Sequence, residues 1–269
     1  MENKKERLDV LIFKKNLVSS REKAKNAVLS GTVCVDGKTV LKPGTLVDEN
    51  SIIRIRNCEN LKYVSRGGLK LEKAIKSFEI DLHNLNCMDV GASTGGFTDC
   101  MIKNNCNIVY AVDVGRNQLD ENLLKNPKVI NLERTNIRNL CKNVFSHTVD
   151  FFTVDVSFIS LELVLPCIKE IISPKGFGIC LIKPQFEAGK DKIGKKGVVK
   201  DKKVHFEVVN KIVCFSISLG FSVLGLDYSP IKGPEGNIEY LIYLKKSDTP
   251  ILKPSINIKE VVDLSHNDL

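Results

Sequence analysis

The chain has 269 residues and a mass of 30.0 kDa, which is enough for one large domain and a small one. Hydrophobic residues make up 43% and charged residues 27% of it, so wholesale disorder is excluded. The formal net charge of +8 permits a polyanionic partner but does not identify one. No apolar run approaches the roughly 20 residues of a membrane span, and the first residues are too charged for a signal peptide. We therefore expect a cytoplasmic protein with no membrane partner.

The nine cysteines are odd in number and scattered along the chain, and none forms a C-x-x-C pair. Several of them, such as Cys87 and Cys180, lie inside apolar runs. Reduced and mostly buried thiols are therefore expected in place of disulfides, and no metal site is predicted.

Composition and turn signals divide the chain into four parts. Residues 1–59 look self-contained, and residues 60–66 form a linker without a long periodic pattern. In residues 67–246, apolar runs of strand length alternate with helical stretches, which predicts a parallel, doubly wound α/β sheet. The last two apolar runs have no helix between them, so the sheet should end in an antiparallel strand. Residues 247–269 are polar, contain two prolines and are expected to be partly extended or loosely docked.

The small domain is predicted to hold two helices and a β-ribbon, which makes an α+β fold. Apolar residues between Leu8 and Ile12 recur at helical spacing, and a capping box that begins at Ser19 starts a second helix. The Asp36-Gly37 pair beyond this helix predicts a tight hairpin.

Cations on outward positions of these two helices predict a basic, RNA-binding face. A solvated helix surface is the alternative explanation. The cations are Arg7, Lys14, Arg21 and Lys25.

The stretch DVGASTGGFTD, residues 89–99, places three glycines between a predicted strand and a helix that starts near Phe97. Glycine is needed where the backbone passes close to a ligand and turns sharply. A nicotinamide-dinucleotide fingerprint would have a glycine where this chain has Ser93. Asp113, about twenty residues further on, ends the next strand, where an acid accepts hydrogen bonds from a ribose diol. These features favour S-adenosylmethionine over a nicotinamide cofactor, with tight packing of the turn as the alternative.

Two common classes of methyl acceptor do not fit the sequence. Enzymes that methylate amino groups of nucleic acids carry an Asn or Asp followed by two prolines and an aromatic residue, whereas the stretch from Asp155 to Phe158 contains no proline. Methylation of a cytosine carbon needs a cysteine nucleophile. Cys167 follows a proline, but it lies inside an apolar stretch with no base beside it, and we take it as a buried structural cysteine.

Four charged residues at or near the ends of predicted strands favour methyl transfer to a hydroxyl: Lys70, Asp155, Lys183 and Glu239. Ligands sit over the carboxyl ends of parallel strands, so Asp155 and Lys183 should face one cleft. A lysine acts as a base only if its pKa falls, and here a second lysine lowers that pKa while carboxylates raise it. Each residue alone has a structural alternative, such as a snorkelling lysine or an acid on an edge strand. Together near one face, they favour positioning and activation of a hydroxyl.

Seven stretches of the chain match a known family in order and spacing: RLDVLIFKKNLVSSREKAKNAVLSGTVCVDGK, YVSRGGLKLEKA, DVGASTGGFTD, YAVDVG, VDVSFISL, LIKPQFEAG and GNIEYLIYL. On these stretches the chain resembles, nearly from end to end, the TlyA family of ribosomal RNA 2'-O-methyltransferases, also known as hemolysin A. The resemblance implies a small RNA-binding domain of the ribosomal-protein-S-four type. It also implies a Rossmann-like class I S-adenosylmethionine-dependent methyltransferase domain like that of the FtsJ heat-shock methyltransferases.

The resemblance also implies roles for individual residues. The family's Lys-Asp-Lys-Glu catalytic set falls on Lys70, Asp155, Lys183 and Glu239, the four residues that the strand ends already indicate. FtsJ relatives usually carry an acid where this chain has Asn136. The cofactor positions fall on Gly91, Ala92, Ser93, Thr94, Gly95, Gly96, Phe97, Asp113, Asn136 and Asp155.

The substrates that the resemblance implies are cytidine 2'-hydroxyls of 23S and, for longer members, 16S ribosomal RNA, free or in ribosomal subunits. The C-terminal residues 247–269 correspond to the extension of the longer members, which favours both targets. The segment YVSRGG stands at the family's interdomain motif, with Tyr63 where some members have tryptophan. Candidate phosphate contacts, for which solvated lysines are the alternative, are Arg66, Lys190, Lys192, Lys195 and Lys196.

Two other classes of function remain open at this point, and a monomer is the favoured state. One is a non-catalytic RNA-binding protein that docks on ribosome assembly intermediates. The other is a membrane-active hemolysin, for which the sequence offers no long amphipathic or spanning segment.

Overall fold

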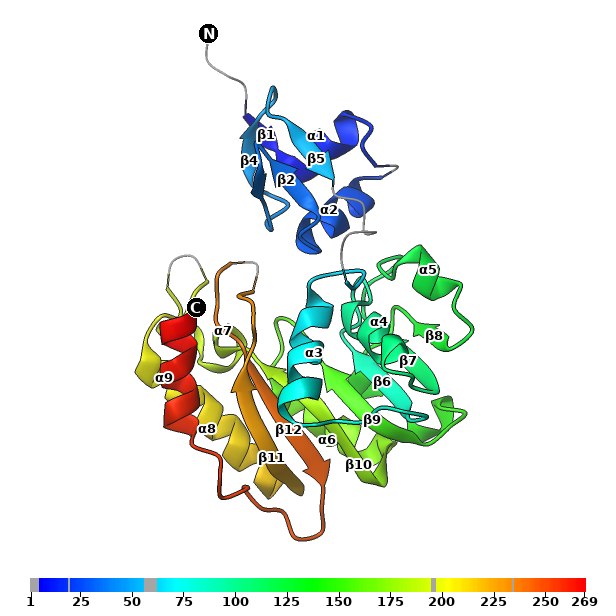
Figure 1. Ribbon diagram of the computed structural model, residues 1–269, viewed down its shortest axis with the longest axis vertical. Coiled ribbons are helices and arrows are strands. Elements are labelled where there is room, and N and C mark those ends of the chain that lie inside the picture. The colour runs from blue at the N-terminus through cyan, green and yellow to red at the C-terminus, as the bar shows by residue number, and fades with distance from the viewer. Residues whose placement is uncertain (1–4, 19, 56–61, 195–196, 234) are drawn as a thin grey trace.

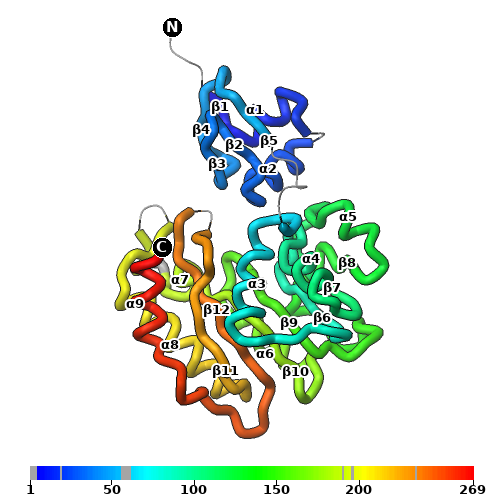
Figure 2. The backbone as a smooth tube through the Cα atoms, in the orientation of Figure 1, coloured from blue at the N-terminus to red at the C-terminus, as the bar shows by residue number. Residues whose placement is uncertain are grey.

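The structure of the chain is a computed structural model that describes residues 5–18, 20–55, 62–194, 197–233 and 235–269. Figure 1 shows a small N-terminal unit and a larger unit built around a seven-stranded sheet. The tube in Figure 2 shows that the chain completes the small unit before it enters the larger one and does not return.

The N-terminal unit packs two helices on two short sheets. Helices α1 and α2 span Leu8–Lys14 and Arg21–Leu29. β1 pairs with β4, and β2 lies between β3 and β5, all antiparallel. Leu8, Ile12 and Val33 are fully buried in the core of this unit. The strands are β1 (Lys5–Arg7), β2 (Val33–Val35), β3 (Lys38–Thr39), β4 (Leu46–Asp48) and β5 (Ile53–Ile55).

Two local expectations for this unit have different outcomes. The predicted hairpin is confirmed, because Asp36 and Gly37 form the two-residue turn between β2 and β3 with φ of 49° and 81°. Ser19, the predicted helix cap, lies outside the described residues. The cap of α2 is Ser20, whose Oγ accepts a hydrogen bond from the Lys23 backbone N–H at 3.1 Å. The residue three positions after the cap is therefore a lysine and not the glutamate of a capping box.

The seven-stranded sheet has the order β11-β12-β10-β9-β6-β7-β8. Neighbours from β10 through β8 are parallel, whereas β12 is antiparallel to both β10 and β11. The predicted doubly wound sheet with an antiparallel last strand is confirmed. The strands are β6 (Asn86–Val90), β7 (Ile108–Val112), β8 (Val129–Leu132), β9 (Val149–Val154), β10 (Ile172–Ile182), β11 (Phe221–Tyr228) and β12 (Tyr240–Lys246).

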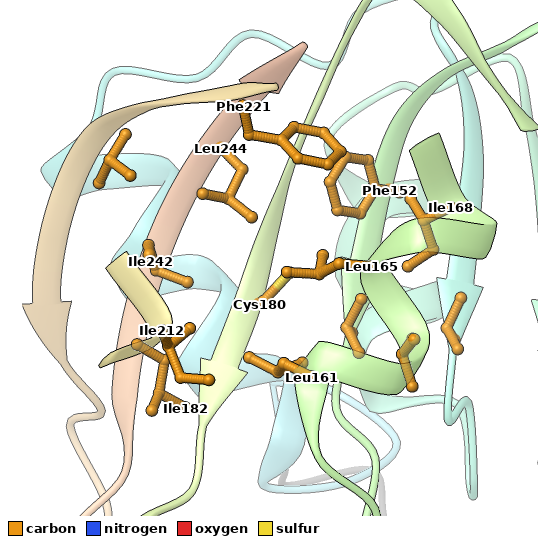
Figure 3. Packing of buried hydrophobic residues seen from close by; sticks show 14 of the residues in the cluster. Phe152, Leu161, Leu165, Ile168, Cys180, Ile182, Ile212, Phe221, Ile242 and Leu244 are labelled. Atoms are coloured by element: carbon orange, nitrogen blue, oxygen red, sulfur yellow. The ribbon is translucent and has the colours of Figure 1, made fainter. Parts of the chain in front are cut away.

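Helices cover both faces of this sheet. Helices α3 and α4 pack on one face, and α6, α8 and α9 pack on the other. Figure 3 shows the second face, where Leu165 of α6 lies against Phe152 and Cys180 of the sheet. The α-helices are α3 (Gly67–Ser77), α4 (Gly96–Lys103), α5 (Glu121–Leu124), α6 (Leu161–Ile171), α7 (Pro184–Glu187), α8 (Lys202–Ser218) and α9 (Ile258–Asp268). Short 3₁₀ helices are η2 (Ile137–Asn139), η3 (Lys142–Val144) and η4 (Lys190–Lys192).

The C-terminal segment differs from the expectation of loose docking. It ends in helix α9, which begins after Asn257, whose Oδ1 accepts from the Glu260 N–H at 3.2 Å. Val262 and Ser265 of this helix are buried against the main core. The polar composition concealed a short amphipathic helix. Cys167 also differs, because it is half-buried on α6 and not fully enclosed.

Candidate active site

Strand alternation places three of the four predicted charged residues on one face of the sheet. Each lies an even number of residues from a side chain buried under α3 and α4, so that its own side chain points the same way: Asp155 from Phe151, Lys183 from Leu181, and Glu239 from Leu241. Helix α3 packs on this face through Leu71 and Ala74, which brings the buried Lys70 over the strand ends. The four residues that are far apart in sequence therefore meet.

The four side chains form a linear chain of ion pairs. Lys70 Nζ lies 2.6 Å from Glu239 Oε2 and 3.4 Å from Asp155 Oδ2. The other carboxylate oxygen of Asp155 lies 2.6 Å from Lys183 Nζ. Glu239 is 1% exposed, Lys70 7% and Lys183 8%, so these charges are removed from most of the solvent and depend on one another.

The pKa shifts follow from this arrangement. Burial would lower the pKa of Lys70, but the carboxylates of Asp155 and Glu239 outweigh it and raise that pKa above its ordinary value. Burial would raise the pKa of Asp155, but the ammonium groups of Lys183 and Lys70 outweigh it and lower that pKa to about 2. Lys70 is therefore held as a cation and Asp155 as an anion at neutral pH, which excludes Lys70 as a base.

Lys183 differs from Lys70 in its second partner. Its Nζ donates to the Ser157 hydroxyl at 3.3 Å and lies 5.9 Å from the centre of the Phe186 ring. Phe158 next to it is 90% exposed, has a φ of 64° and lies 5.0 Å from Phe186 between ring centres. An exposed aromatic ring on left-handed backbone is costly without a function. Neither Ser157 nor Phe158 could be recognised as functional from the sequence, because a serine and an apolar residue after a strand form no distinctive pattern.

The glycine turn connects β6 to α4 beside these charges. Gly91 and Gly95 have φ of 84° and 94°, a region that favours glycine. A Cβ on Gly91 would lie 2.4 Å from the Asp155 carbonyl oxygen, so the glycine lets the turn approach β9 closely. The alternative of tight packing thus explains part of the glycine pattern, in addition to access for a ligand.

Asp89 ties the glycine turn to the strand that carries Asp155. Its carboxylate accepts from Thr98 Oγ1 at 2.7 Å and from Thr153 Oγ1 at 2.9 Å, and it is fully buried. Burial raises the pKa of Asp89 to about 6, although both threonine hydrogen bonds oppose this shift. One buried acid thus links β6, α4 and β9 directly below the site.

A cleft of about 240 Å³ opens over the strand ends and the glycine turn. It is lined by all four charged residues, by part of the turn and by three residues of the N-terminal unit: Leu29, Ser30 and Leu41. The lining carries charges of both signs together with backbone of the turn, so the cleft fits a ligand that has charged and polar groups. Within the described residues no group of three or more His, Cys, Asp and Glu side chains is arranged to hold a metal ion.

The predicted cofactor residues do not all line this cleft. Ala92, Ser93, Thr94 and Phe97 line it together with two of the glycines. Asp113 does not line the cleft itself but lies behind the glycine turn. Its carboxylate accepts hydrogen bonds from the backbone N–H groups of Ser93 at 2.7 Å and Gly115 at 2.6 Å. Its remaining lone pairs are available to a diol. Asn136 does not line the cleft, and its Oδ1 caps η2 through the Arg138 N–H at 3.0 Å.

Among the predicted phosphate contacts whose side chains the structure describes, Arg66 is half-buried, whereas the others are exposed and paired with nearby acids. Arg66 lines the cleft, and burial lowers the pKa of its guanidinium. Lys192 pairs with Glu207. The side chain of Lys190, and all of Lys195 and Lys196, lie outside the described residues. On the N-terminal unit, the pairs are Arg7 and Arg21 with Asp9 at 3.0 and 3.3 Å, Lys14 with Glu6 at 2.6 Å and Lys25 with Glu22 at 3.7 Å.

Two family models match the chain. The FtsJ-like methyltransferase model matches residues 63–246, and the S4 domain model matches residues 6–53. A similar protein is "Putative rRNA methyltransferase YqxC" of Bacillus subtilis, 43% identical over 100% of this chain and 97% of its own length. "16S/23S rRNA (cytidine-2'-O)-methyltransferase TlyA" of Mycobacterium tuberculosis is 37% identical over 89% of each chain.

Solved structures agree with these matches. A structure described as "Putative hemolysin from Streptococcus thermophilus" superposes with a TM-score of 0.78 at 43% identity, over 99% of this chain and 97% of that one. For the fold alone, an S-adenosylmethionine dependent methyltransferase from Listeria monocytogenes superposes with a TM-score of 0.51 at 16% identity, over 68% of this chain and 98% of that one. Despite the hemolysin name, no helix in the described part of this chain has the length and apolar character to cross a membrane.

Proposed function

The chain belongs to the FtsJ-like methyltransferase family, and on this basis we propose that it methylates ribose 2'-hydroxyls of ribosomal RNA. The methyl donor is S-adenosylmethionine, which supplies an electrophilic methyl group on its sulfonium when bound. The name of the Mycobacterium tuberculosis relative supports cytidines of 23S and 16S ribosomal RNA as the targets. These substrates would place the protein in the cytoplasm, where it acts as a monomer.

The observation that carries this proposal is the ion-pair chain of Lys70, Asp155, Lys183 and Glu239 beside the glycine turn. Methyl transfer requires the acceptor oxygen to be held in line with the methyl group, so most of the catalysis is positioning. We assign this positioning to Lys183, because its second partner is a hydroxyl, at Ser157 Oγ. A ribose hydroxyl can take the place of that serine hydroxyl. As its oxygen accepts the methyl group, the bond from that methyl to the sulfonium sulfur breaks and the hydroxyl releases its proton to water.

The remaining three residues hold Lys183 in position. Asp155 orients the Lys183 ammonium through the contact of 2.6 Å. Lys70 stays protonated, because two carboxylates raise its pKa, and it keeps Asp155 and Glu239 from repelling each other. In this assignment Lys70 and Glu239 stabilise the site, and Asp155 with Lys183 contacts the reacting groups.

The cofactor contacts are proposed on the turn Gly91–Phe97 and on Asp113, whose oriented carboxylate suits a ribose diol. Asn136, which does not line the cleft, is proposed as a more distant contact of the cofactor. Phe158 offers a stacking surface for a base that has left the RNA stack, because its ring is exposed and lies against Phe186, whose own ring faces Lys183 Nζ at 5.9 Å.

The RNA is proposed to bind across both units. We assign residues 1–59 to the RNA-binding domain, 60–66 to the linker, 67–246 to the methyltransferase domain and 247–269 to a C-terminal extension. The S4 match supports the first assignment. Arg66 is the strongest candidate for a phosphate contact near the reaction, since it lines the cleft that holds the catalytic set.

The test is methyl transfer from radiolabelled S-adenosylmethionine to purified 50S and 30S subunits and to free ribosomal RNA. Wild-type protein should label ribose 2'-oxygens, and Lys183→Ala should lose this activity while it still binds S-adenosylmethionine in calorimetry. Wild-type activity of Lys183→Ala would refute the assignment of Lys183. RNA binding by wild-type protein without any methyl transfer would support the non-catalytic alternative.

A further inference from the structure

The loop between β11 and β12 covers Glu239, the acid that pairs with Lys70. The Ser229 backbone N–H donates to the Glu239 carbonyl at 2.8 Å, which closes the base of the loop. A Cβ on Gly233 would lie 2.7 Å from Glu239 Oε1, so the loop backbone passes directly over the carboxylate. Ile231 and Lys232 of the same loop line the cleft. The position of Glu239 is therefore tied to the conformation of this loop.

Asn237 fastens this loop to a second loop, the one that follows Lys183 and α7. The Asn237 side chain is 3% exposed. Its Oδ1 accepts from the Val199 N–H at 3.1 Å, and its Nδ2 donates to the Gly197 carbonyl at 2.9 Å. Its own backbone carbonyl accepts from the Gly233 N–H at 2.9 Å. The Asn237 side chain thus connects the β11–β12 loop, which covers Glu239, to the loop that carries the candidate phosphate-binding lysines.

A second buried contact holds the same loop from the other side. His205 of α8 is fully buried, and its Nε2 lies 2.9 Å from the Val199 carbonyl. Its Nδ1 lies 2.7 Å from the hydroxyl of Tyr240, the residue after Glu239. Since a carbonyl only accepts, Nε2 carries the proton and Tyr240 donates to Nδ1. Asn237 and His205 therefore hold the two backbone groups of Val199. Asn237 lies shortly before β12 in the chain, and His205 bonds to Tyr240, the first residue of β12.

We propose that Asn237 is a positioning residue for Glu239. Its side chain hydrogen-bonds the β11–β12 loop to the loop after Lys183 and in this way fixes the position of the Glu239 carboxylate. This inference rests on the proposed function, because it assumes that Glu239 supports Lys70 in methyl transfer. These hydrogen bonds make the two loops move together. Contact of RNA with the loop after Lys183 is therefore coupled to the alignment of the Lys70 and Glu239 pair. The amide is suited to this task, since it provides one acceptor and one donor at fixed spacing.

The test is a double-mutant cycle on single-turnover methyl transfer, with Asn237→Ala and Glu239→Gln. If Asn237 acts through Glu239, Asn237→Ala should lower the rate on the order of tenfold in the wild-type background and have no further effect in the Glu239→Gln background. The KM for S-adenosylmethionine should stay unchanged. Additive losses in the cycle, or an unchanged rate in folded Asn237→Ala, would overturn the inference.

Two further variants separate this role from loss of stability. Asn257→Ala removes the N-cap of α9 and should lower stability without changing the rate, as a matched Asn-to-Ala control away from the cleft. Asn237→Asp keeps the acceptor for Val199 but cannot donate to Gly197, so it should repeat the rate loss if Asn237→Ala does not fold. A wild-type rate in Glu239→Gln would overturn the proposed role of the ion-pair chain as well, whereas additivity would overturn only the role of Asn237.

Discussion

Lys183 and Asp155 form an ion pair in which Nζ lies 2.6 Å from Oδ1. The other oxygen of the same carboxylate lies 3.4 Å from Lys70 Nζ, so the two lysines share Asp155. Asp155 therefore separates two buried ammonium groups that would otherwise repel each other. Its removal should affect both the orientation of Lys183 and the stability of the folded chain, and the two effects can be measured separately.

Asp155→Asn is expected to lower kcat by at least about a hundredfold, because the amide no longer orients the Lys183 ammonium. It is also expected to lower the free energy of unfolding by about 3 kcal/mol, since the charges of Lys183 and Lys70 then lie buried with one carboxylate between them. Methyl transfer assays and urea unfolding measure these two quantities. A variant that keeps both activity and stability would contradict the shared role of Asp155.

The low pKa of Asp155 predicts a specific loss of stability in acid. Its pKa is about 2 in the folded chain and 3.8 in the ordinary carboxyl, so the unfolded state binds more protons between these values. The contribution of Asp155 is complete above pH 4 and is lost as the pH falls through 2. The stability gap between wild type and Asp155→Asn should therefore narrow by about 1 kcal/mol between pH 7 and pH 3, in urea unfolding at each pH. A gap that is constant over this range would contradict the assignment.

The meeting of Asp155 and Lys183 at one edge of the sheet could be predicted from the sequence, because the ends of apolar strands are easy to recognise. Asp155 and Lys183 directly follow apolar strands, and the carboxyl ends of parallel strands meet at one edge of the sheet. The antiparallel last strand could be predicted for a similar reason, since no helix separates β11 from β12. These features depend on local periodicity, which a single sequence displays.

Loop contacts could not be predicted in the same way. Asn237 meets Gly197 and Val199 across forty residues of sequence, and no periodic pattern marks an amide that bridges two loops. In the sequence Phe158 resembles any other apolar residue, and only the structure shows that its ring is exposed. Helix α9 was missed because its segment is polar overall and contains two prolines, which outweighed the helical spacing of Ile258, Val261 and Val262.

Asp89 is expected to lower the free energy of unfolding at neutral pH, although its hydrogen bonds connect three elements of the site. Its pKa is about 6 in the folded chain, so the folded state binds more protons than the unfolded state between pH 4 and pH 6. Stability conferred by this group therefore rises as the pH falls through 6. Relative to Asp89→Asn, which can still bond to Thr98 and Thr153, wild type should gain about 2 kcal/mol of unfolding free energy from pH 7 to pH 4.

Urea unfolding of both proteins at pH 7 and pH 4 measures this difference. Asp81→Asn serves as the control, because Asp81 is an exposed acid that accepts a hydrogen bond from the His83 backbone N–H at 2.9 Å. The control should show no comparable change with pH. An identical pH dependence of wild type and Asp89→Asn would show that Asp89 is ionised in the folded chain as readily as in the unfolded one.

Phe158→Ala should separate RNA binding from folding. The ring is 90% exposed, so its removal should change the unfolding free energy by less than about 0.5 kcal/mol. Loss of a stacking surface for one base should weaken productive RNA binding by about 1 to 3 kcal/mol, seen as a higher KM for RNA with unchanged binding of S-adenosylmethionine. Phe206→Ala, at an exposed phenylalanine of α8 that is distant in sequence from Asp155 and Lys183, is the control and should leave the KM for RNA unchanged. Equal effects of the two substitutions would mean that Phe158 has no specific role in base stacking.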